Sequence, residues 1–503
     1  MNNNYFKRVL SVILLLAVIL SGAASAVSCA KDNISNNSGE NKNLTSDNNQ
    51  NPEIENQEDP FDPKLPEANY EGYEFRILNI DEEELWWAIA NVSVEQQTGE
   101  VVNDAIYKRN TNIEDKYNFT IKEIRMSASA MDKALKNSVN AGGDEYDLVL
   151  PLTTSAPSHA QNRYLADLYK VPKLNFDKPW WNNSINRYLS VNNKLFFACS
   201  NLILSPDEDA GVMMYNKNIS ESLGLDSAES LYKLVDEGKW TFDKFSQLCK
   251  DASADLNGNG KIDPLEDRFG IITVDWLYQA ILGGFGETLV AKDANDTPYL
   301  SCKSERFLNG YIKMTEYMLQ RNVVVREWLD FNGPTDVLFI NDKALFCCEV
   351  LGCVRVFKDM GSDFGVLPFP KLDESQDRYY TYTLVSTCIG VPVTNQNLDR
   401  TGTILEALSA ESRKLVIPAY YDVALGLKYL RDEGSLRMLD VILENKIYDI
   451  CDSRVMYKWG GFAEAVKNFA KKGDVNFFSV IDKYEDKTIA DIQKTIDAYN
   501  ETD

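Results

Sequence analysis

Histidine is almost missing from this chain of 503 residues, which contains only His159. A single histidine excludes metal sites and catalytic centres that need two or more, and the neighbours of His159 form no recognisable catalytic motif. None of the spacings between the cysteines matches a zinc signature. We therefore expect His159 to be structural, with its ring satisfied by a hydrogen bond near the start of a helix.

Basic residues are scarce beside acidic ones. The sequence has 52 Lys and Arg against 76 Asp and Glu, which gives a net charge of -24. Such a surface repels phosphate backbones and anionic lipid headgroups, so nucleic acid is excluded as a partner. Long apolar runs are also missing after the first 29 residues, and no later segment is expected to cross a membrane.

The first 29 residues have the layout of a secretory signal. The basic pair Lys7-Arg8 precedes an apolar run from Val9 to Leu20, and small residues then lead to Cys29. An apolar run of about a dozen residues is too short to span a bilayer as a permanent helix. The residues AVSC (26–29) resemble the lipobox of bacterial lipoproteins. We expect residues 1–28 to be a signal peptide removed before a lipidated Cys29, with plain cleavage after Ala26 as the alternative.

The next segment, residues 29–66, is rich in Asn, Ser, Asp and Glu and nearly free of large apolar side chains. Such a composition cannot bury enough surface to fold, so this segment is predicted to be a lipidated, disordered tether. The remainder is longer than the roughly 250 to 300 residues that one hydrophobic core supports, and two domains are expected.

Strand-like and helical patterns alternate after the tether, which predicts an α/β fold with a parallel sheet. The strands are expected at 73–80, 119–124 and 146–150, with helical stripes from Val102 to Tyr117 and from Met131 to Val139. Ligands of such sheets lie beyond the carboxyl ends of the strands, here 79–87 and 151–155. A second sheet is predicted from 195–198, 211–215, 269–273, 344–348, 364–367 and 382–391. Further helices are expected at 218–237, 242–252, 305–320, 404–415, 436–443, 462–470 and in a last segment ending near Tyr499.

Eight cysteines remain after Cys29, and several of them lie in apolar runs. A free cysteine in such a position behaves as a small hydrophobic residue. We expect buried thiols, while the predicted compartment also permits disulfides.

The segment from Asp255 to Glu266 matches the calcium-loop pattern D-x-[DN]-x-[DN]-G-x5-E at every required position. A hard cation needs six to eight oxygens, and side chains at alternate positions point inward while Gly260 permits the sharp turn. The expected ligands of a bound Ca²⁺ are Asp255, Asn257, Asn259, the carbonyl of Lys261, Asp263 and Glu266. The alternative is a solvated turn rich in Asn and Gly.

A strand pattern, 269–273, follows the calcium loop, and the sequence holds no second copy of the loop. A regulatory EF-hand needs an exiting helix that can move. We therefore expect calcium to be structural.

Several short motifs, taken in order, resemble those of extracellular solute-binding proteins of family 1, the carbohydrate receptors of bacterial ABC importers. They are GGDEYDLV (142–149), MYNK (214–217), GKWT (238–241), FINDKALF (339–346) and GVLPFP (365–370). With the lipobox, the resemblance covers residues 67–503 and points to a branch from Gram-positive bacteria.

The resemblance implies a two-lobed periplasmic-binding-protein-like fold of type II with the ligand cleft between the lobes. The N-terminal lobe would comprise 67–200 plus 371–398, and the C-terminal lobe 201–370 plus 399–503. It further implies a non-enzymatic monomer, lipid-anchored at the extracellular face of the cell membrane, with a carbohydrate ligand and an ABC permease as partners.

A sugar receptor needs flat rings for the apolar faces of a pyranose and polar side chains for its hydroxyls. Trp180, Trp181 and Trp240 are predicted to pack in the core. For many of the candidates the alternatives are core packing of the rings and solvation of the acids. The candidate ligand-binding residues are Trp86, Trp87, Trp276 and Trp459, with Asp207, Glu208, Asp209 and Glu349 as polar contacts.

Two other functions stay open at this point. The many acidic residues could supply the carboxylate pair of a tethered glycan hydrolase, which needs an acid and a base about 5 to 9.5 Å apart. A receptor of the same fold could instead bind peptides or signal to a membrane kinase.

Overall fold

The computed structural model describes residues 59–327, 330–331, 333, 335–430, 432–452 and 454–501. The predicted signal peptide, Cys29 and the predicted tether up to residue 58 lie outside these residues. The chain divides into two units after Pro60, and the sheets described below belong to the unit Phe61–Asp503. Within the described part of the chain, no helix combines the length and the apolar character needed to cross a membrane.

The first sheet is parallel, as predicted, with strand order β2-β1-β3. It consists of β1 (Tyr73–Ile80), β2 (Phe119–Met126) and β3 (Leu148–Val149). Two helices make the crossovers, α2 (Val101–Tyr117) and α3 (Ala128–Asn140). The side chain of Glu100 caps the start of α2 by accepting from the backbone N–H of Asn103, and α2 ends at Asn118 in the left-handed conformation that asparagine tolerates.

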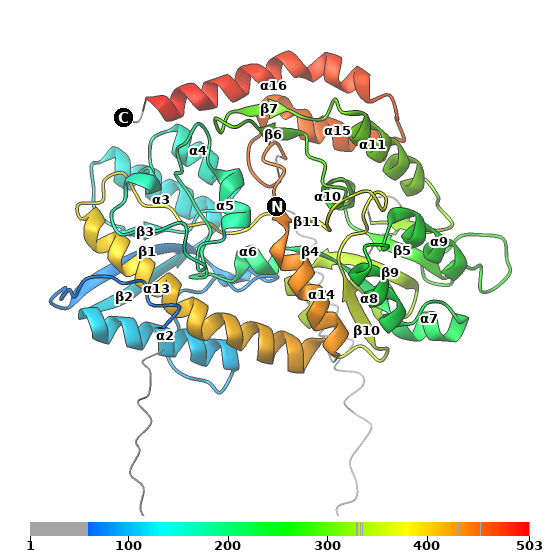
Figure 1. Ribbon diagram of the computed structural model, residues 1–503, viewed down its shortest axis with the longest axis horizontal. Helices are drawn as coiled ribbons and strands as arrows, with labels where there is room; N and C mark the ends of the chain where they lie inside the picture. Colours follow the sequence, from blue (N-terminus) through cyan, green and yellow to red (C-terminus); the bar gives the residue numbers. More distant parts are fainter. Residues whose placement is uncertain are drawn as a thin grey trace, which may run out of the picture. The chain divides into compact units, whose positions relative to one another are not determined.

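The second sheet is mixed, with strand order β10-β4-β9-β5-β8. Its central strand pair is antiparallel, whereas β5 lies parallel to both of its neighbours. We call the elements around the first and the second sheet the first and the second lobe; they lie at the left and right of Figure 1. The strands are β4 (Gly211–Asn216), β5 (Phe269–Thr273), β8 (Val324–Arg326), β9 (Ala344–Val350) and β10 (Phe364–Leu367).

The helix predicted at 218–237 is in fact two helices. Gly224 ends the first in the left-handed conformation, and the Ser227 side chain caps the start of the second. The helices and the hairpin of this region are α7 (Lys217–Leu223), α8 (Ala228–Asp236), α9 (Phe242–Ala252), α10 (Leu277–Gly284), β6 (Val290–Lys292), β7 (Pro298–Leu300), α11 (Glu305–Met318) and α12 (Asp336–Ile340).

Two predicted strands do not form continuous ladders. The run 195–198 makes only an isolated bridge, from Ala198 to Ile389, and the run 382–391 contributes only the last residue of β11 (Thr381–Tyr382) and several isolated bridges. The reason is that successive residues of 382–391 pair with different segments, first with Ala210 and then with Leu152 and Val149 of the first lobe. No single partner strand runs beside it.

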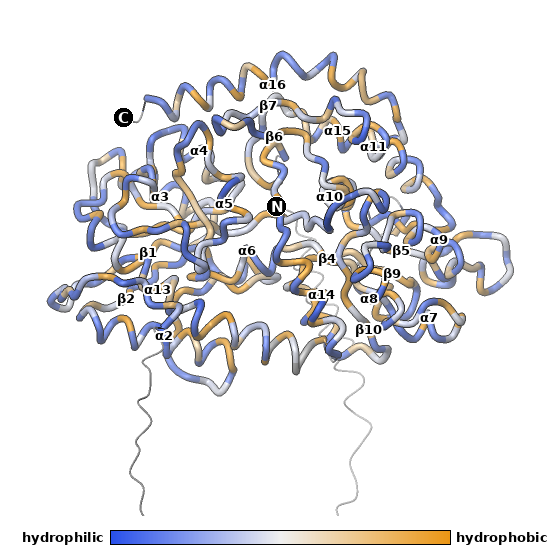
Figure 2. The backbone as a smooth tube through the Cα atoms, in the orientation of Figure 1, coloured by the Kyte–Doolittle hydropathy of each residue, from blue (hydrophilic) through white to orange (hydrophobic). Residues whose placement is uncertain are grey.

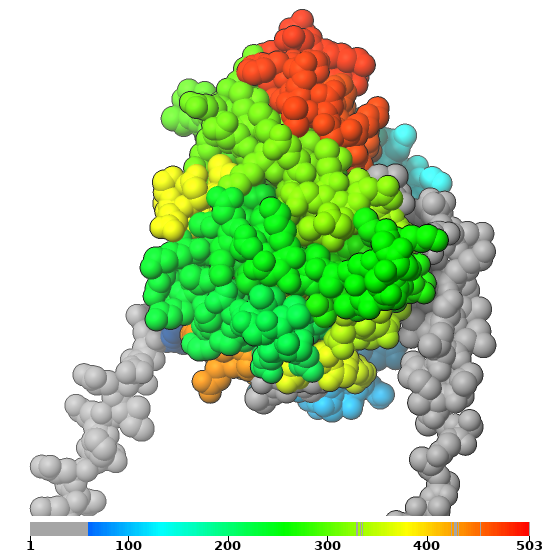
Figure 3. Space-filling model, turned by 90° about the vertical axis from the view of Figure 1, so that its right-hand side faces the viewer, coloured from blue at the N-terminus to red at the C-terminus, as the bar shows by residue number. Residues whose placement is uncertain are grey.

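The C-terminal helices match the predicted pattern. α13 (Leu398–Pro418), which the predicted boundary assigns to the second lobe, packs against α2 of the first lobe. The last helix, α16 (Phe477–Asn500), alternates between polar and apolar residues (Figure 2) and contacts α4 as well as α15. Figure 3 shows the residues of the last helices, in red, at the top of the molecule. The other elements here are η4 (Ala419–Tyr429), α14 (Glu433–Glu444), β12 (Lys446–Ile447), η5 (Trp459–Gly461) and α15 (Phe462–Lys471).

Short elements connect the two lobes and complete the first. They are η1 (Glu82–Leu85), α4 (Ala156–Gln161), η2 (Leu168–Lys170), α5 (Asn183–Leu189) and α6 (Ser205–Glu208), whereas η3 (Leu351–Phe357) lies between β9 and β10 of the second lobe. His159 lies buried in α4 with Nε2 2.7 Å from Asp132 Oδ1, which confirms the structural role. All eight cysteines in the described residues are buried free thiols, as expected.

Candidate functional site

Three consecutive acidic residues lie where the chain passes from the first lobe into β4. Asp207 and Glu208 end the short helix α6, and Asp209 follows it. The alternative prediction for these acids was a solvated loop, but their side chains are buried, with exposed fractions of 7, 0 and 1%. Buried charges need partners, and each of the three finds different ones.

Asp207 joins two segments of the C-terminal half. Its carboxylate forms an ion pair with Lys446 of β12 and accepts a hydrogen bond from Tyr421 Oη of η4 at 2.7 Å. Asn182 Nδ2 lies 3.5 Å from the same carboxylate. The ion pair compensates both buried charges, so Asp207 fixes β12 and η4 at the junction.

Glu208 joins the two lobes. Its Oε1 lies 2.7 Å from Arg355 Nη1 of η3, in the second lobe, and its Oε2 accepts from the backbone N–H of Ile89, in the first lobe. Burial raises the pKa of Glu208, and the charge of Arg355 opposes that shift. The carboxylate is therefore held by one contact from each side.

Asp209 contacts the first of the predicted aromatic residues. Its Oδ1 accepts from Trp87 Nε1 at 2.7 Å, and its Oδ2 accepts from Ser205 Oγ at 2.8 Å. Burial raises the pKa of Asp209 well above its ordinary value, while both hydrogen bonds lower it. The structure thus brings Trp87 and the acidic residues into one cluster.

The neighbouring ring, Trp86, is the exposed member of the pair. Its side chain is 46% exposed, and the two indoles meet edge to face with centroids 5.9 Å apart. Both residues directly follow η1, after the carboxyl end of β1, where the parallel sheet predicted a ligand site. An exposed ring beside buried acids combines the two kinds of group that bind a sugar.

Glu349 lies on β9, opposite Val212 of β4. The side chain is only partly buried, yet burial raises its pKa to about 8, and the acidic groups of Glu327 and Asp336 add to the shift. Burial and the two neighbouring acids therefore favour the protonated form of Glu349, which can donate as well as accept a hydrogen bond.

Trp276 and Trp459 are both nearly buried, at 8 and 3% exposure. Trp276 precedes the first residue of α10. Trp459 stacks on Tyr457 with centroids 4.2 Å apart and donates from Nε1 to Thr495 Oγ1 of α16 at 2.9 Å. These contacts tie Trp459 to the C-terminal helix.

Several residues of the cluster were not predicted from the sequence, namely Arg355, Lys446 and Tyr421. Each comes from a segment far along the chain from Asp207, so spacing carries no signal for them. One signal was available for Arg355, because it is the single charged residue in the apolar run LGCVRVF (351–357).

The predicted calcium loop is closed by hydrogen bonds to its own backbone. Asp255 accepts from the N–H groups of Gly258 and Gly260, both at 2.8 Å, and both glycines have positive φ. The side chain of Glu266 accepts from Asn257 Nδ2. Among the described residues, no three His, Cys, Asp or Glu side chains are gathered closely enough to hold a metal ion.

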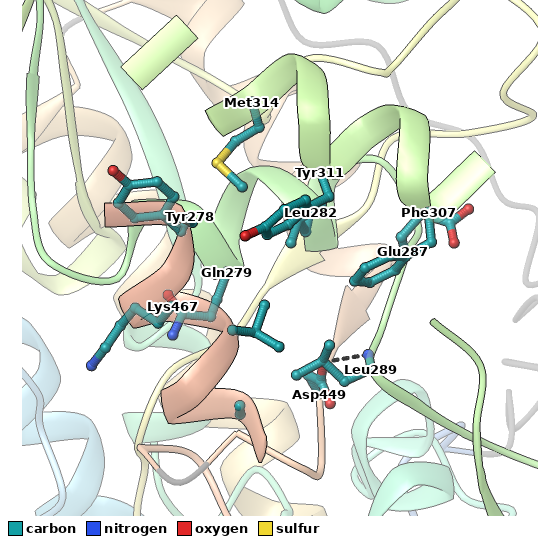
Figure 4. Close-up of a pocket in the computed structure, with 13 residues that line it drawn as sticks. Tyr278, Gln279, Leu282, Glu287, Leu289, Phe307, Tyr311, Met314, Asp449 and Lys467 are labelled. Atoms are coloured by element: carbon teal, nitrogen blue, oxygen red, sulfur yellow. Dashed lines mark hydrogen bonds between the residues drawn. The ribbon is translucent and has the colours of Figure 1, made fainter. Parts of the chain in front are cut away.

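Two hollows lie away from the acidic cluster. The enclosed one holds about 20 Å³, room for one water, beside Asp449 and Leu289 (Figure 4). Leu289 N donates to Asp449 at 2.7 Å, and burial raises the pKa of Asp449 to about 7. The open hollow, of about 510 Å³, has no aromatic ring in its lining of Glu305, Arg306, Asn309, Lys313, Leu372 and Asp373. Neither suits the stacking of a sugar ring.

No protein-family model and no characterised protein sequence matches the chain. Solved structures do resemble it. The sugar-binding protein MalE from Xanthomonas citri has a TM-score of 0.57 at 13% identity, covering 83% of this chain and 98% of its own. The cyclic alpha-maltosyl-1,6-maltose binding protein from Arthrobacter globiformis has a TM-score of 0.56 at 14% identity, with coverage of 84% and 99%.

A third structure, an ABC substrate-binding protein from Listeria monocytogenes in complex with cycloalternan, has a TM-score of 0.53 at 13% identity. It covers 84% of this chain and 99% of its own. The structural similarity establishes the fold, but sequence identities this low do not identify the ligand. The chain therefore has the two-lobed α/β fold of the substrate-binding proteins of sugar ABC transporters.

Proposed function

We propose that the chain is an extracellular receptor that captures a carbohydrate of oligosaccharide size by lobe closure and delivers it to an ABC importer. The observation that carries this proposal is the cluster at the lobe junction, where Trp86 and Trp87 lie beside Asp207, Glu208 and Asp209. Rings can cover the apolar faces of a sugar, and carboxylates can accept from its hydroxyls.

Closure is a shift between open and closed populations of one molecule. A ligand drives the shift only if it contacts both lobes in the closed form. The cluster meets this requirement because it draws Trp87 and Ile89 from the first lobe and Arg355 from the second. Capture and release need no covalent chemistry.

The lipid anchor at Cys29 would keep the receptor at the outer face of the cell membrane, near its permease. Metabolic labelling with a radioactive fatty acid tests this part. The full chain should take up label, and Cys29→Ser should lose it and release the protein into the medium. Equal labelling of both would overturn the anchor and leave the receptor proposal untouched.

The ligand class is tested by thermal unfolding of the full-length chain against mono- and oligosaccharides and short peptides. A ligand at one hundred times its dissociation constant adds about 2.7 kcal/mol to the stability of the folded state, which raises the Tm by several degrees. A rise with one class of glycan supports the proposal. A rise with peptides alone, or hydrolysis of a glycan by the purified protein, would replace it with one of the two alternatives.

We also propose that the loop from Asp255 to Glu266 binds Ca²⁺ as a structural ion. The expected ligands are Asp255, Asn257, Asn259, the Lys261 carbonyl, Asp263 and Glu266, and the positive φ of Gly260, the sixth residue of the loop, supports the proposal. A bound ion would neutralise the acidic loop and hold it in one conformation. Unfolding with and without a chelator tests this proposal, and equal midpoints would overturn it.

A further inference from the structure

The segment that contains Trp87 and Ile89 is firmly fixed to the first lobe. Asn79 of β1 donates from Nδ2 to the carbonyl of Ala90 at 2.8 Å. Glu123 of β2 accepts from the backbone N–H of Ser93 at 2.8 Å. This segment therefore moves with the first sheet when the lobes move.

The same segment is seated against the lobe junction and the second lobe at three points. Trp87 Nε1 donates to Asp209, and Ile89 N donates to Glu208, whose other oxygen is bound by Arg355 of η3. The third point is a backbone approach at Gly352, also in η3, which follows β9.

Gly352 is required by this approach. A Cβ atom at this position would lie 2.0 Å from the carbonyl oxygen of Trp87 and 3.2 Å from Cβ of Glu208. Both neighbours are held rigidly, one as backbone and one as a fully buried side chain. Any larger residue at position 352 would therefore force the first lobe away from η3.

We propose that these contacts form an interlobe latch, in which Trp87 and Ile89 of the first lobe occupy Asp209 and Glu208 and hold the cleft shut before any ligand binds. This inference rests on the proposed function, because the carboxylates proposed to bind the ligand are the ones that Trp87 and Ile89 bind in the latch. A sugar hydroxyl that binds Asp209 must first displace the indole N–H of Trp87. The latch thus sets a cost that every ligand has to offset.

The latch explains how the acids at the junction can be buried. A buried carboxylate without hydrogen bonds is unfavourable by several kcal/mol, and the indole and amide donors remove that penalty in the closed form. Opening exposes the same carboxylates to water, which also satisfies them. The closed and open forms can therefore be close in free energy, as a receptor requires.

Distances between the lobes test the latch directly. Spin labels on engineered cysteines at Lys122 of β2 and Lys233 of α8 report on lobe separation in the full-length chain. Both lysines are exposed, at 54% and 73%, and the eight cysteines of the described residues are buried, so labelling is selective once Cys29 is replaced by Ser.

Without any ligand, the chain should give one dominant short distance. Gly352→Ala should move most of the population to a longer distance, whereas the matched control Gly361→Ala should not, because a Cβ at Gly361 meets nothing within 4 Å. Identical distances for both variants, with normal unfolding midpoints, would overturn the proposal.

A second variant guards against misfolding of Gly352→Ala. Trp87→Phe keeps an aromatic ring but loses the donor to Asp209, and it should shift part of the population to the longer distance. An unchanged distribution would overturn the latch. If a sugar ligand has been found, its apparent dissociation constant for this variant should fall by the same factor by which the fraction of open molecules rises. Failure to find any sugar would count against the proposed function, while the distances still decide the latch.

Discussion

Trp180 and Glu406 are hydrogen-bonded deep in the first lobe, with Nε1 of the indole 3.0 Å from Oε1 of the carboxylate. Their side chains are 0 and 1% exposed. The other carboxylate oxygen accepts from Trp181 Nε1 at 2.9 Å. One glutamate of α13 thus satisfies both indoles of the connecting segment, which confirms the predicted packing role of this tryptophan pair.

Removing this carboxylate should destabilise the fold strongly. Glu406→Ala leaves two buried N–H donors without an acceptor, each unfavourable by about 1–3 kcal/mol, so the free energy of unfolding should fall by about 2–6 kcal/mol. Urea denaturation measures the change. Glu229→Ala, at a side chain that is 76% exposed, is the control and should stay within about 0.5 kcal/mol of the parent. Equal effects of the two substitutions would contradict this role.

Glu406 should also make stability depend on pH. Burial raises the pKa of Glu406 to about 7, and the hydrogen bonds from the two indoles offset only part of this rise. An exposed glutamate has a pKa of about 4.3. Between these values the folded chain holds a proton that the unfolded chain has released. The contribution to stability is therefore greatest at low pH and is lost as the pH rises through about 7.

The measurement is the difference in unfolding free energy between the parent and Glu406→Gln from pH 4 to pH 8. The parent should lose stability relative to the variant by up to about 3 kcal/mol over this range. Parallel curves would show that the carboxyl titrates normally in the folded protein.

Trp86 should contribute to sugar binding through its exposed face. Trp86→Ala should weaken the affinity for the glycan identified by thermal shift by about two- to tenfold, the range expected when one ring contact is lost. Isothermal titration calorimetry measures the change. Tyr299→Ala is the matched control, since Tyr299 is 49% exposed on β7, outside the predicted site. Equal affinities for both variants would remove Trp86 from the site.

Glu266 should be essential for calcium. It is the only predicted ligand that would supply two carboxylate oxygens, so Glu266→Gln should weaken Ca²⁺ binding about tenfold or more. Calcium titration followed by tryptophan fluorescence or calorimetry measures this, with Glu229→Gln in the same lobe as the control. A Ca²⁺ affinity unchanged by Glu266→Gln would place the ion elsewhere.

The regular elements could be predicted from the sequence because local periodicity determines them. The strand 73–80 and the helical stripe ending at Tyr117 were located within a residue, since a buried strand and an amphipathic helix have distinct patterns. The segment 382–391 was misjudged because its residues have strand-like composition but pair with several partners. Composition carries no information about which segments a strand-like run will pair with.

The candidate site was predictable only in part. Trp87 and Asp209 were both named as ligand candidates from their places beside predicted strands, and the structure brings them together. The basic partners of the neighbouring acids lie far along the chain: Arg355 is 147 residues after Glu208 and Lys446 is 239 residues after Asp207, and only the tertiary fold brings them together. Whether a side chain such as Trp459 faces a cleft or a helix is likewise decided by tertiary packing, here against α16.

The hydroxyl of Thr495 accepts from Gln161 of α4 at 2.7 Å and from Trp459 at 2.9 Å, so α16 is tied to both lobes at one point. The chain is made from its N-terminus, so α16 emerges after the elements of both lobes that it joins. The lobes can each begin to fold earlier, but this tie between them forms only once α16 has been made. A chain truncated before Phe477 would lack the tie, and a protease should therefore cleave it more readily than a chain that retains α16.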